Sequence, residues 1–316
     1  MRLAFVFPGQ GSQSVGMLDG FAGDAAVART LAVASEALGE DLASLIARGP
    51  AESLGLTINT QPAMLATSMA CLAAWREAGG PAPVAVAGHS LGEYTALAAA
   101  DAIALPDAVR LVRLRARAMQ DAVPVGAGAM AAVLGLDDDA VRACCAEACG
   151  AEVVEAVNYN APAQVVIAGH AAAVARACDA ARARGAKRAV ALPVSAPFHS
   201  SLIEPAAARL RAALDAIELR RPAVALVNNV DAAVETDPAR IRDALVRQAY
   251  CPVRWVEVVR ALRALGATHL VEFGPGKVLA GLARRIDPAL GALAVHDARS
   301  LELALAEVGR SEQVSG

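Results

Sequence analysis

Aromatic side chains are scarce in this sequence of 316 residues, since Phe, Trp and Tyr together make up only 3% of it. The net charge is −3, so there is no excess of basic residues either. Proteins that bind nucleic acids usually combine a basic face with aromatic side chains that stack on bases. We therefore expect no nucleic-acid partner, and any basic contact surface must be local.

Long apolar runs are also missing, although 56% of the residues are hydrophobic. No stretch approaches the roughly 20 strongly apolar residues that a bilayer-spanning helix needs. The best candidate, residues 62–75, contains Thr67 and Ser68 and predicts a helix buried in the core. The opening run Leu3–Phe7 is too short for a signal peptide and predicts a strand. We therefore expect a cytoplasmic protein with no membrane contact.

The six cysteines form no Cys-x-x-Cys pair. Cys144, Cys145 and Cys149 cluster on an expected helix, but no histidine lies near them in the sequence. Zinc sites usually need such paired ligands, and cytosolic thiols stay reduced. We interpret these cysteines as core residues and expect neither a metal nor a redox cofactor.

The order of strand and helix patterns predicts an α/β fold with two parts. Short apolar runs alternate with helical patterns in residues 1–123 and again in 194–316, which is typical of a parallel sheet. Between them, residues 124–193 follow the order β-α-β-β-α-β of ferredoxin-like units. We expect a discontinuous large α/β domain, 1–123 plus 194–316, with a ferredoxin-like small domain inserted at 124–193. The expected strands are Leu3–Phe7, Val84–Ala87, Ala129–Leu134, Glu152–Val157, Gln164–Ala168, Arg188–Leu192, Val224–Val227 and His269–Phe273.

The pentapeptide Gly88-His89-Ser90-Leu91-Gly92 follows a strand pattern and precedes a helical one. This is the context of the Gly-x-Ser-x-Gly nucleophile elbow, in which a sharp turn exposes the serine oxygen. The N–H of Leu91 would lie at a helix N-terminus, where it can stabilise an oxyanion. A glycine-flanked packing turn is the alternative. The flanking strand and helix favour Ser90 as the nucleophile of an acyl-transfer enzyme.

A serine nucleophile needs a base, and histidine is the usual one. His199 lies in the irregular segment 194–200, where the chain returns from the small domain to the large one. Because active sites form in interdomain clefts, we expect His199 to be the base. His89 lies inside the elbow and is expected to be a structural hydrogen-bonding residue. The remaining histidines, which we consider weaker candidates, are His170, His269 and His296.

Several motifs occur together in a fixed order along nearly the whole chain. They are Phe7–Gln13, Gly88–Tyr94, Gly128–Met130, Asn158–Asn160, Pro197–Ser200 and Phe273–Lys277. In this combination the sequence resembles the malonyl-CoA:acyl carrier protein transacylases of type II fatty acid synthesis. The resemblance implies a hydrolase-like α/β domain with a ferredoxin-like insert. It also implies transfer of malonyl from malonyl-CoA to the phosphopantetheine thiol of acyl carrier protein, through a malonyl-serine and without a cofactor.

The resemblance also assigns roles around Ser90. It implies that the N–H of Gln10 is the second oxyanion donor and that Gln248 orients His199 through a neutral carbonyl. Residue chemistry alone would have favoured Asp231 or Glu272 as the third member of a triad.

For the acyl group, the resemblance singles out Arg115 as the partner of the malonyl carboxylate. Arg113, Arg115 and Arg117 cannot share one helix face, so we expect at least one to turn inward and others to meet solvent. A phenylalanine at Phe198 accompanies malonyl rather than methylmalonyl use in related enzymes. The further substrate-binding residues that the resemblance implies are Met119, Asn158 and Asn160.

Lys187 and Arg188 form a local basic pair that could contact CoA phosphates or an acidic carrier protein, or could simply be solvated. Acyl carrier protein is expected to bind only transiently, and the protein to be a monomer. Two other classes of function stay open: a serine hydrolase, in which water is the acceptor, and a carrier-binding module with an inactive site. Polyketide synthesis and malonate decarboxylation remain alternative pathways for the same chemistry.

Overall fold

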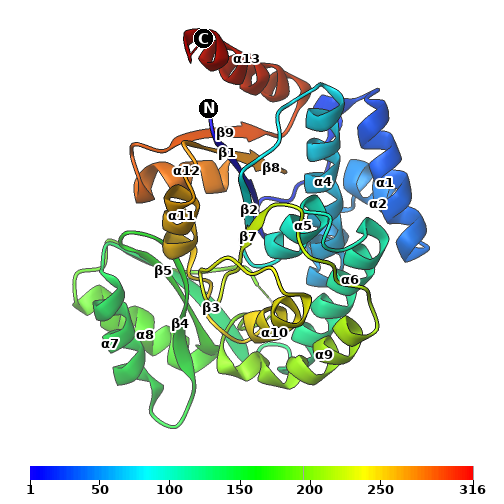
Figure 1. Ribbon diagram of the computed structural model, residues 1–316. Helices are drawn as coiled ribbons and strands as arrows, with labels where there is room; N and C mark the ends of the chain where they lie inside the picture. Colours follow the sequence, from blue (N-terminus) through cyan, green and yellow to red (C-terminus); the bar gives the residue numbers. More distant parts are fainter. Residues whose placement is uncertain (195, 316) are drawn as a thin grey trace.

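The computed structural model describes the backbone of residues 1–194 and 196–315 and their side chains up to Arg310. Within this part of the chain the strands form two separate sheets, one parallel with five strands and one antiparallel with four. Figure 1 shows the small sheet, in green, beside the helices that cover one face of the large sheet. The parallel α/β sheet that the sequence predicted is confirmed.

The large sheet has the strand order β7-β2-β1-β8-β9 and lies inside the protein. All five residues of its central strand β1 are buried, as expected for a parallel sheet covered on both faces. Its strands are β1 (Leu3–Phe7), β2 (Ala85–Gly88), β7 (Ala225–Val227), β8 (His269–Phe273) and β9 (Gly291–Val295). The edge strand β9 was not predicted, because its Gly-Ala-Leu-Ala-Val sequence has little β propensity.

Helices pack on both faces of the large sheet (Figure 1). The helices that share a core with Phe5 and Phe273 on one face include α4 and α6, whereas α11 and α12 pack with Val6 and Leu270 on the other. The elements are η1 (Asp19–Phe21), α1 (Ala25–Leu38), α2 (Leu42–Arg48), α3 (Ala51–Gly55), α4 (Thr57–Glu77), α5 (Gly92–Ala99), α6 (Leu105–Asp121), η2 (Ser201–Ala206), α9 (Ala207–Asp215), α10 (Pro238–Gln248), α11 (Trp255–Ala264), α12 (Val278–Ile286) and α13 (Ala298–Ser315).

Helix α4 is the buried helix that the apolar stretch 62–75 predicted. Its Trp75 is fully buried and packs edge-on against Phe5 and Phe273, the two phenylalanines of adjacent strands β1 and β8. In the described part of the chain, no helix is both long and apolar enough to cross a membrane.

The small sheet has the order β4-β5-β3-β6, with both of its helices sharing one core with it. Cys144 and Cys145 lie in this core, as predicted, whereas Cys149 is half-buried. The elements are β3 (Gly128–Leu134), α7 (Asp138–Cys149), β4 (Val154–Ala161), β5 (Gln164–His170), α8 (Ala171–Ala183) and β6 (Arg188–Ala191).

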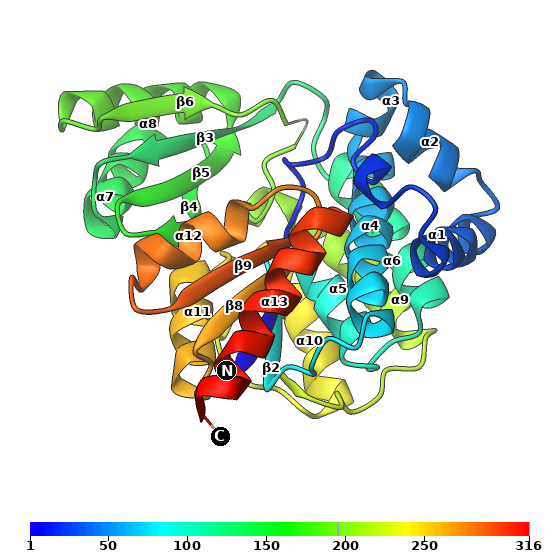
Figure 2. The same ribbon diagram turned by 90° about the horizontal axis from the view of Figure 1, so that it is seen from above.

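Strand β4 connects the small sheet to the rest of the protein. It runs past the predicted end at Val157, with register shifts against β5 around residues 156–161. There it pairs with the segment before α11: the N–H of Tyr159 donates to the carbonyl of Val253, and the N–H of Val253 donates to the carbonyl of Val157. Figure 2 shows β4 next to α11 and α12. This contact brings Asn158 and its neighbours close to the carboxyl ends of the large sheet's strands.

Candidate active site

Ser90 stands on a sharp turn between β2 and α5. Its φ of 53° lies in the left-handed region, which is unusual for a residue with a side chain. Only glycine fits on either side of it, because a Cβ on Gly88 would lie 1.9 Å from the carbonyl carbon of Gly92, and a Cβ on Gly92 would lie 2.0 Å from the carbonyl oxygen of Phe7. The strand, the strained serine and the two close backbone approaches together form a nucleophile elbow.

His199 reaches Ser90 from the segment that follows β6. Its Nε2 lies 2.7 Å from the Ser90 Oγ, and its Nδ1 lies 2.8 Å from the backbone carbonyl oxygen of Gln248. A carbonyl oxygen can only accept, so Nδ1 carries the proton and Nε2 is free to accept the serine proton. The pair therefore has the geometry of a nucleophile and its general base.

Among the described residues, no carboxylate accepts a hydrogen bond from this histidine. Asp231 instead receives two hydrogen bonds from Arg247, at 3.0 and 2.8 Å, and Glu272 accepts the N–H of Ala280 at 2.8 Å. The acceptor is the main-chain carbonyl of Gln248, whose side chain is engaged elsewhere. The sequence indicated this residue but not that the backbone would supply the carbonyl.

The electrostatics keep His199 neutral. Burial, together with the positive charge of Arg115, lowers the pKa of His199 from 6.5 to about 3. Desolvation and a nearby like charge both disfavour the imidazolium. The free base is therefore the form present at neutral pH.

Arg115 extends from α6 into the site, where only 2% of it is exposed. Its guanidinium donates to Gln61 Oε1 at 2.9 Å, to Gln248 Oε1 at 2.9 Å and to the Ser90 Oγ at 3.2 Å. It also lies 5.3 Å from the centre of the Tyr94 ring. Within the described part of the chain these acceptors are neutral, and no carboxylate forms an ion pair with Arg115. A buried cation without an ion-pair partner is suited to bind an anionic ligand.

The neighbouring arginines behave differently. Arg113 is also largely buried and makes two hydrogen bonds to Glu40, at 2.9 and 2.7 Å, whereas Arg117 is exposed. Two of the three arginines therefore turn inward, and only Arg115 reaches Ser90.

Gln10 and Leu91 line the same cavity as Ser90, and each carries a backbone N–H. The N–H of Leu91 precedes the first turn of α5, and Gln10 follows β1 in a loop whose Gly9 lies directly against His89. Among the described residues, none accepts a hydrogen bond from either N–H. Both N–H groups are therefore free to donate to a ligand in this cavity, as an oxyanion hole requires.

These groups surround a cavity of about 110 Å³. Phe198 and Asn158 lie in its wall, and Asn160 lies in the wall of an adjoining cavity, where its Oδ1 is 2.8 Å from His89 Nε2. The cavity is lined by Gly9, Gln10, Gln61, His89, Ser90, Leu91, Arg115, Met130, Asn158, Leu192, Val194, Phe198 and His199.

Known proteins are similar to this chain over nearly its whole length. Residues 4–288 match the family described as acyl transferase domain. The chain is 53% identical over 305 residues to the malonyl CoA-acyl carrier protein transacylase of Escherichia coli strain K12, a match covering 96% of this chain and 99% of the relative. This chain belongs to the malonyl CoA-acyl carrier protein transacylase family.

Solved members of the transacylase family have the same fold. The acyl-carrier-protein S-malonyltransferase of Burkholderia pseudomallei 1710b is 62% identical, with a TM-score of 0.95 over 97% of this chain and all of that one. A malonyl-transacylase in complex with its type II polyketide synthase acyl-carrier protein is 49% identical, with a TM-score of 0.95, and covers 97% of this chain and 100% of its own.

Three predicted residues of this transacylase family member lie away from the cavity. Met119 is buried in the core one turn beyond Arg115, about 6 Å further along α6, and does not line the cavity among the described residues. Its assignment as a substrate-binding residue stays a prediction, and the methionine in the cavity wall is Met130 of β3. Lys187 and Arg188 are exposed at the start of β6, roughly 13 Å along the strand from Leu192.

Four polar residues of the site were not predicted: Gln61, Glu93, Tyr94 and Asn229. Glu93 is fully buried, and burial raises its pKa to about 7. Gln61 is a buried polar residue directly before the apolar stretch 62–75 of α4, and Asn229 follows a strand of the parallel sheet at its carboxyl end, where ligand sites form. These two sequence positions could therefore have identified Gln61 and Asn229 as residues of the site.

Proposed function

We propose that this protein transfers malonyl from malonyl-CoA to the phosphopantetheine thiol of an acyl carrier protein and so supplies fatty acid synthesis. The main structural support is Arg115, a buried cation without a carboxylate partner among the described residues, whose guanidinium lies 3.2 Å from the Ser90 Oγ. A guanidinium binds a carboxylate through two parallel hydrogen bonds, so Arg115 would hold the free end of a malonyl group beside the nucleophile. The names of the relatives support the same donor and acceptor.

The proposed reaction has two half-reactions. In the first, His199 takes the proton of Ser90 while the serine oxygen attacks the thioester carbonyl. The N–H groups of Gln10 and Leu91 stabilise the oxyanion; the C–S bond then breaks, and CoA leaves as the thiol after its sulfur takes the proton from His199. In the second, His199 takes the proton of the carrier thiol, the sulfur attacks the malonyl-serine ester, and Ser90 regains its proton. The kinetics are ping-pong.

The carbonyl of Gln248 holds the Nδ1 proton of His199 through both steps. Because this acceptor is neutral, it stabilises the imidazolium less than an aspartate would. Asn158 and Asn160 are proposed to contact the substrate from β4, and Lys187 and Arg188 to contact CoA phosphates or the acidic carrier further out.

We also propose that residues 124–193 are a ferredoxin-like unit inserted into a large domain formed by 1–123 and 194–316. The sheet order β4-β5-β3-β6 with two helices in one shared core supports this division. The protein is proposed to work as a monomer in the cytoplasm, in keeping with its unpaired cysteines.

Transfer itself tests the proposed function. Labelled malonyl-CoA should donate its acyl group to holo acyl carrier protein far faster than to water, whereas a hydrolase would release free malonate faster than it loads the carrier. Apo carrier, which has no thiol, serves as the control and should receive no label. Free malonate as the main product would contradict the proposal.

The pH–rate profile should begin to fall only at an unusually low pH. His199 acts as a base only when neutral, and its pKa of about 3 keeps it neutral well below the ordinary 6.5. The kcat/KM for malonyl loading, which reports the free enzyme, should therefore not fall as the pH drops from 7.5 to 5. Rates over pH 4.5–8, with circular dichroism as a check on folding, would reveal a limb near 6.5 if the account were wrong.

Phe198 should limit the size of the acyl group. It lies in the cavity wall with 7% of its surface exposed. Phe198→Ala should raise the ratio of methylmalonyl to malonyl loading about tenfold, because the extra methyl group gains room. Phe21→Ala, which truncates a buried phenylalanine outside this cavity, should leave the ratio unchanged. An unchanged ratio in Phe198→Ala would remove Phe198 from acyl selection.

A further inference from the structure

The side chain of Asn229 makes two hydrogen bonds to the backbone of the nucleophile elbow. It is fully buried just after β7, the strand that pairs with β2. Its Oδ1 accepts the backbone N–H of Ser90 at 2.7 Å, and its Nδ2 donates to the carbonyl of Gly88 at 2.7 Å. One amide group therefore binds the backbone of both residues that adjoin His89, Gly88 before it and Ser90 after it.

These two bonds act where the backbone is strained. Ser90 has a φ of 53°, a conformation that side chains disfavour and that persists only when the surroundings fix it. The amide engages the N–H of Ser90 and leaves the next one, that of Leu91, without an acceptor among the described residues. The turn thus presents the serine oxygen to His199 and the Leu91 N–H to an oxyanion.

Asn229 is itself fixed by the residues that carry the base. Its backbone N–H donates to Glu93 Oε2 at 3.0 Å, and the same oxygen accepts from Gln248 Nε2 at 2.9 Å. That Nε2 also donates to the carbonyl of Ser90 at 2.8 Å, and the Gln248 carbonyl accepts from His199. A closed network therefore links the backbone of the nucleophile to the residue that orients its base.

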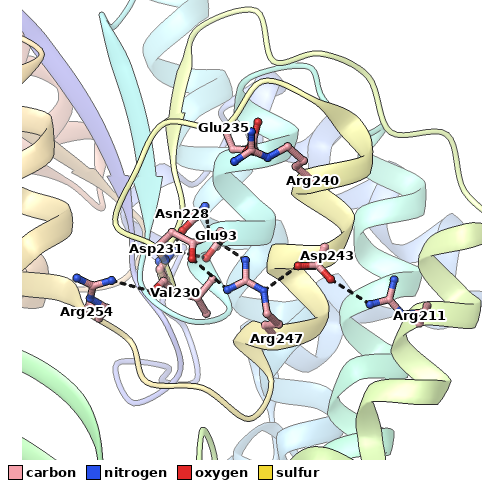
Figure 3. Close-up of polar contacts among 11 residues, drawn as sticks. Glu93, Arg211, Asn228, Val230, Asp231, Glu235, Arg240, Asp243, Arg247 and Arg254 are labelled. Atoms are coloured by element: carbon pink, nitrogen blue, oxygen red, sulfur yellow. Dashed lines mark hydrogen bonds and ion pairs between the residues drawn. The ribbon is translucent and has the colours of Figure 1, made fainter.

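Next to this network, Arg247, Asp231 and Asp243 form a set of ion pairs that we call the ion-pair ladder. Figure 3 shows Arg247 on α10 joined to Asp231 and to Asp243. Arg247 directly precedes Gln248, and Asp231 lies two residues after Asn229. The ladder thus ties the end of α10 to the loop that carries the amide.

We infer that Asn229 is a positioning residue for acyl transfer, because its amide sets the angle at which Ser90 meets His199 and the oxyanion donors. The inference rests on the proposed function. Asn229 makes no hydrogen bond to Arg115, whose acceptors are Gln61, Gln248 and Ser90. Its loss should therefore slow acylation without weakening the binding of malonyl-CoA.

Asn228 provides a matched control. It is the same residue type in the same loop and is 2% exposed, but its side chain bonds to Asp231 rather than to the elbow. Asn228→Ala and Asn229→Ala each remove a buried amide, so a purely structural role would affect both alike.

The experiment compares rapid-quench formation of malonyl-serine in wild type, Asn228→Ala and Asn229→Ala at saturating malonyl-CoA. Asn229→Ala should be about 100-fold slower, the cost of misplacing a reacting atom by about 1 Å, whereas Asn228→Ala should stay near the wild-type rate. The Kd for malonyl-CoA, measured in a Ser90→Ala background, should not change on adding Asn229→Ala. Asn229→Asp keeps an oxygen acceptor for Ser90 but loses the donor to Gly88, and should load at an intermediate rate.

Equal rates in wild type and Asn229→Ala, or equal losses in Asn228→Ala and Asn229→Ala, would overturn the inference while leaving the proposed function intact. If Asn229→Ala does not fold, Asn229→Asp loading at the full wild-type rate would overturn it instead. A wild-type protein that takes up no malonyl group would overturn the proposed function and this inference with it.

Discussion

Replacing Ser90 with alanine should abolish malonyl transfer, with a loss on the order of 10⁶-fold, as expected when a serine nucleophile is removed. Alanine leaves no oxygen near the His199 Nε2, which lies 2.7 Å from the Ser90 Oγ, so no acyl ester can form. The measurement is transfer of labelled malonyl from malonyl-CoA to holo carrier.

A second serine serves as the control. Ser68→Ala removes a fully buried hydroxyl from α4 that does not line the site's cavity, and it should leave transfer near the wild-type rate. Substantial transfer by Ser90→Ala would mean that carrier and donor react directly, without an ester on this residue.

Replacing Arg115 with alanine should reverse the choice of acyl group. The malonyl carboxylate would then be buried without its cation, and breaking such a pair costs about 3–5 kcal/mol, or on the order of 10²–10⁴-fold in malonyl loading. The rate of acetyl loading should not fall, because an acetyl group has no carboxylate to pair with Arg115. Competition between malonyl-CoA and acetyl-CoA, read as the mass of the acylated protein, measures the ratio.

Arg113→Ala is the matched control for this change, since Arg113 lies on the same helix and is largely buried but pairs with Glu40. It should lower stability and leave the acyl preference as it is. If Arg115→Ala kept the malonyl preference of the wild type, the proposed carboxylate contact would be wrong.

Local patterns predicted the parts of this site that depend on local chemistry. The alternation of strands and helices gave the parallel sheet, and the glycines around Ser90 predicted a turn that only glycine can flank, as the close approaches at Gly88 and Gly92 show. His199 was found because the chain returns to the large sheet at that point. Each of these predictions needed only a few neighbouring residues.

Contacts between distant segments could not be predicted in the same way. A backbone carbonyl has no side-chain signature, so nothing in the sequence marks the acceptor at Gln248 as main chain rather than side chain. Asn229 lies 139 positions from Ser90, and Met130 reaches the cavity only because the small sheet docks through β4.

In the proposed reaction, Ser90 carries the malonyl group between donor and carrier. To test this role, the protein is incubated with malonyl-CoA alone, its intact mass is measured, the adduct is mapped by peptide mass spectrometry, and holo carrier is then added. We expect one malonyl group per chain, located on the peptide that contains Ser90, and we expect it to disappear as malonyl-carrier forms. An adduct on another residue, or a malonyl-serine that the carrier thiol does not discharge, would contradict it.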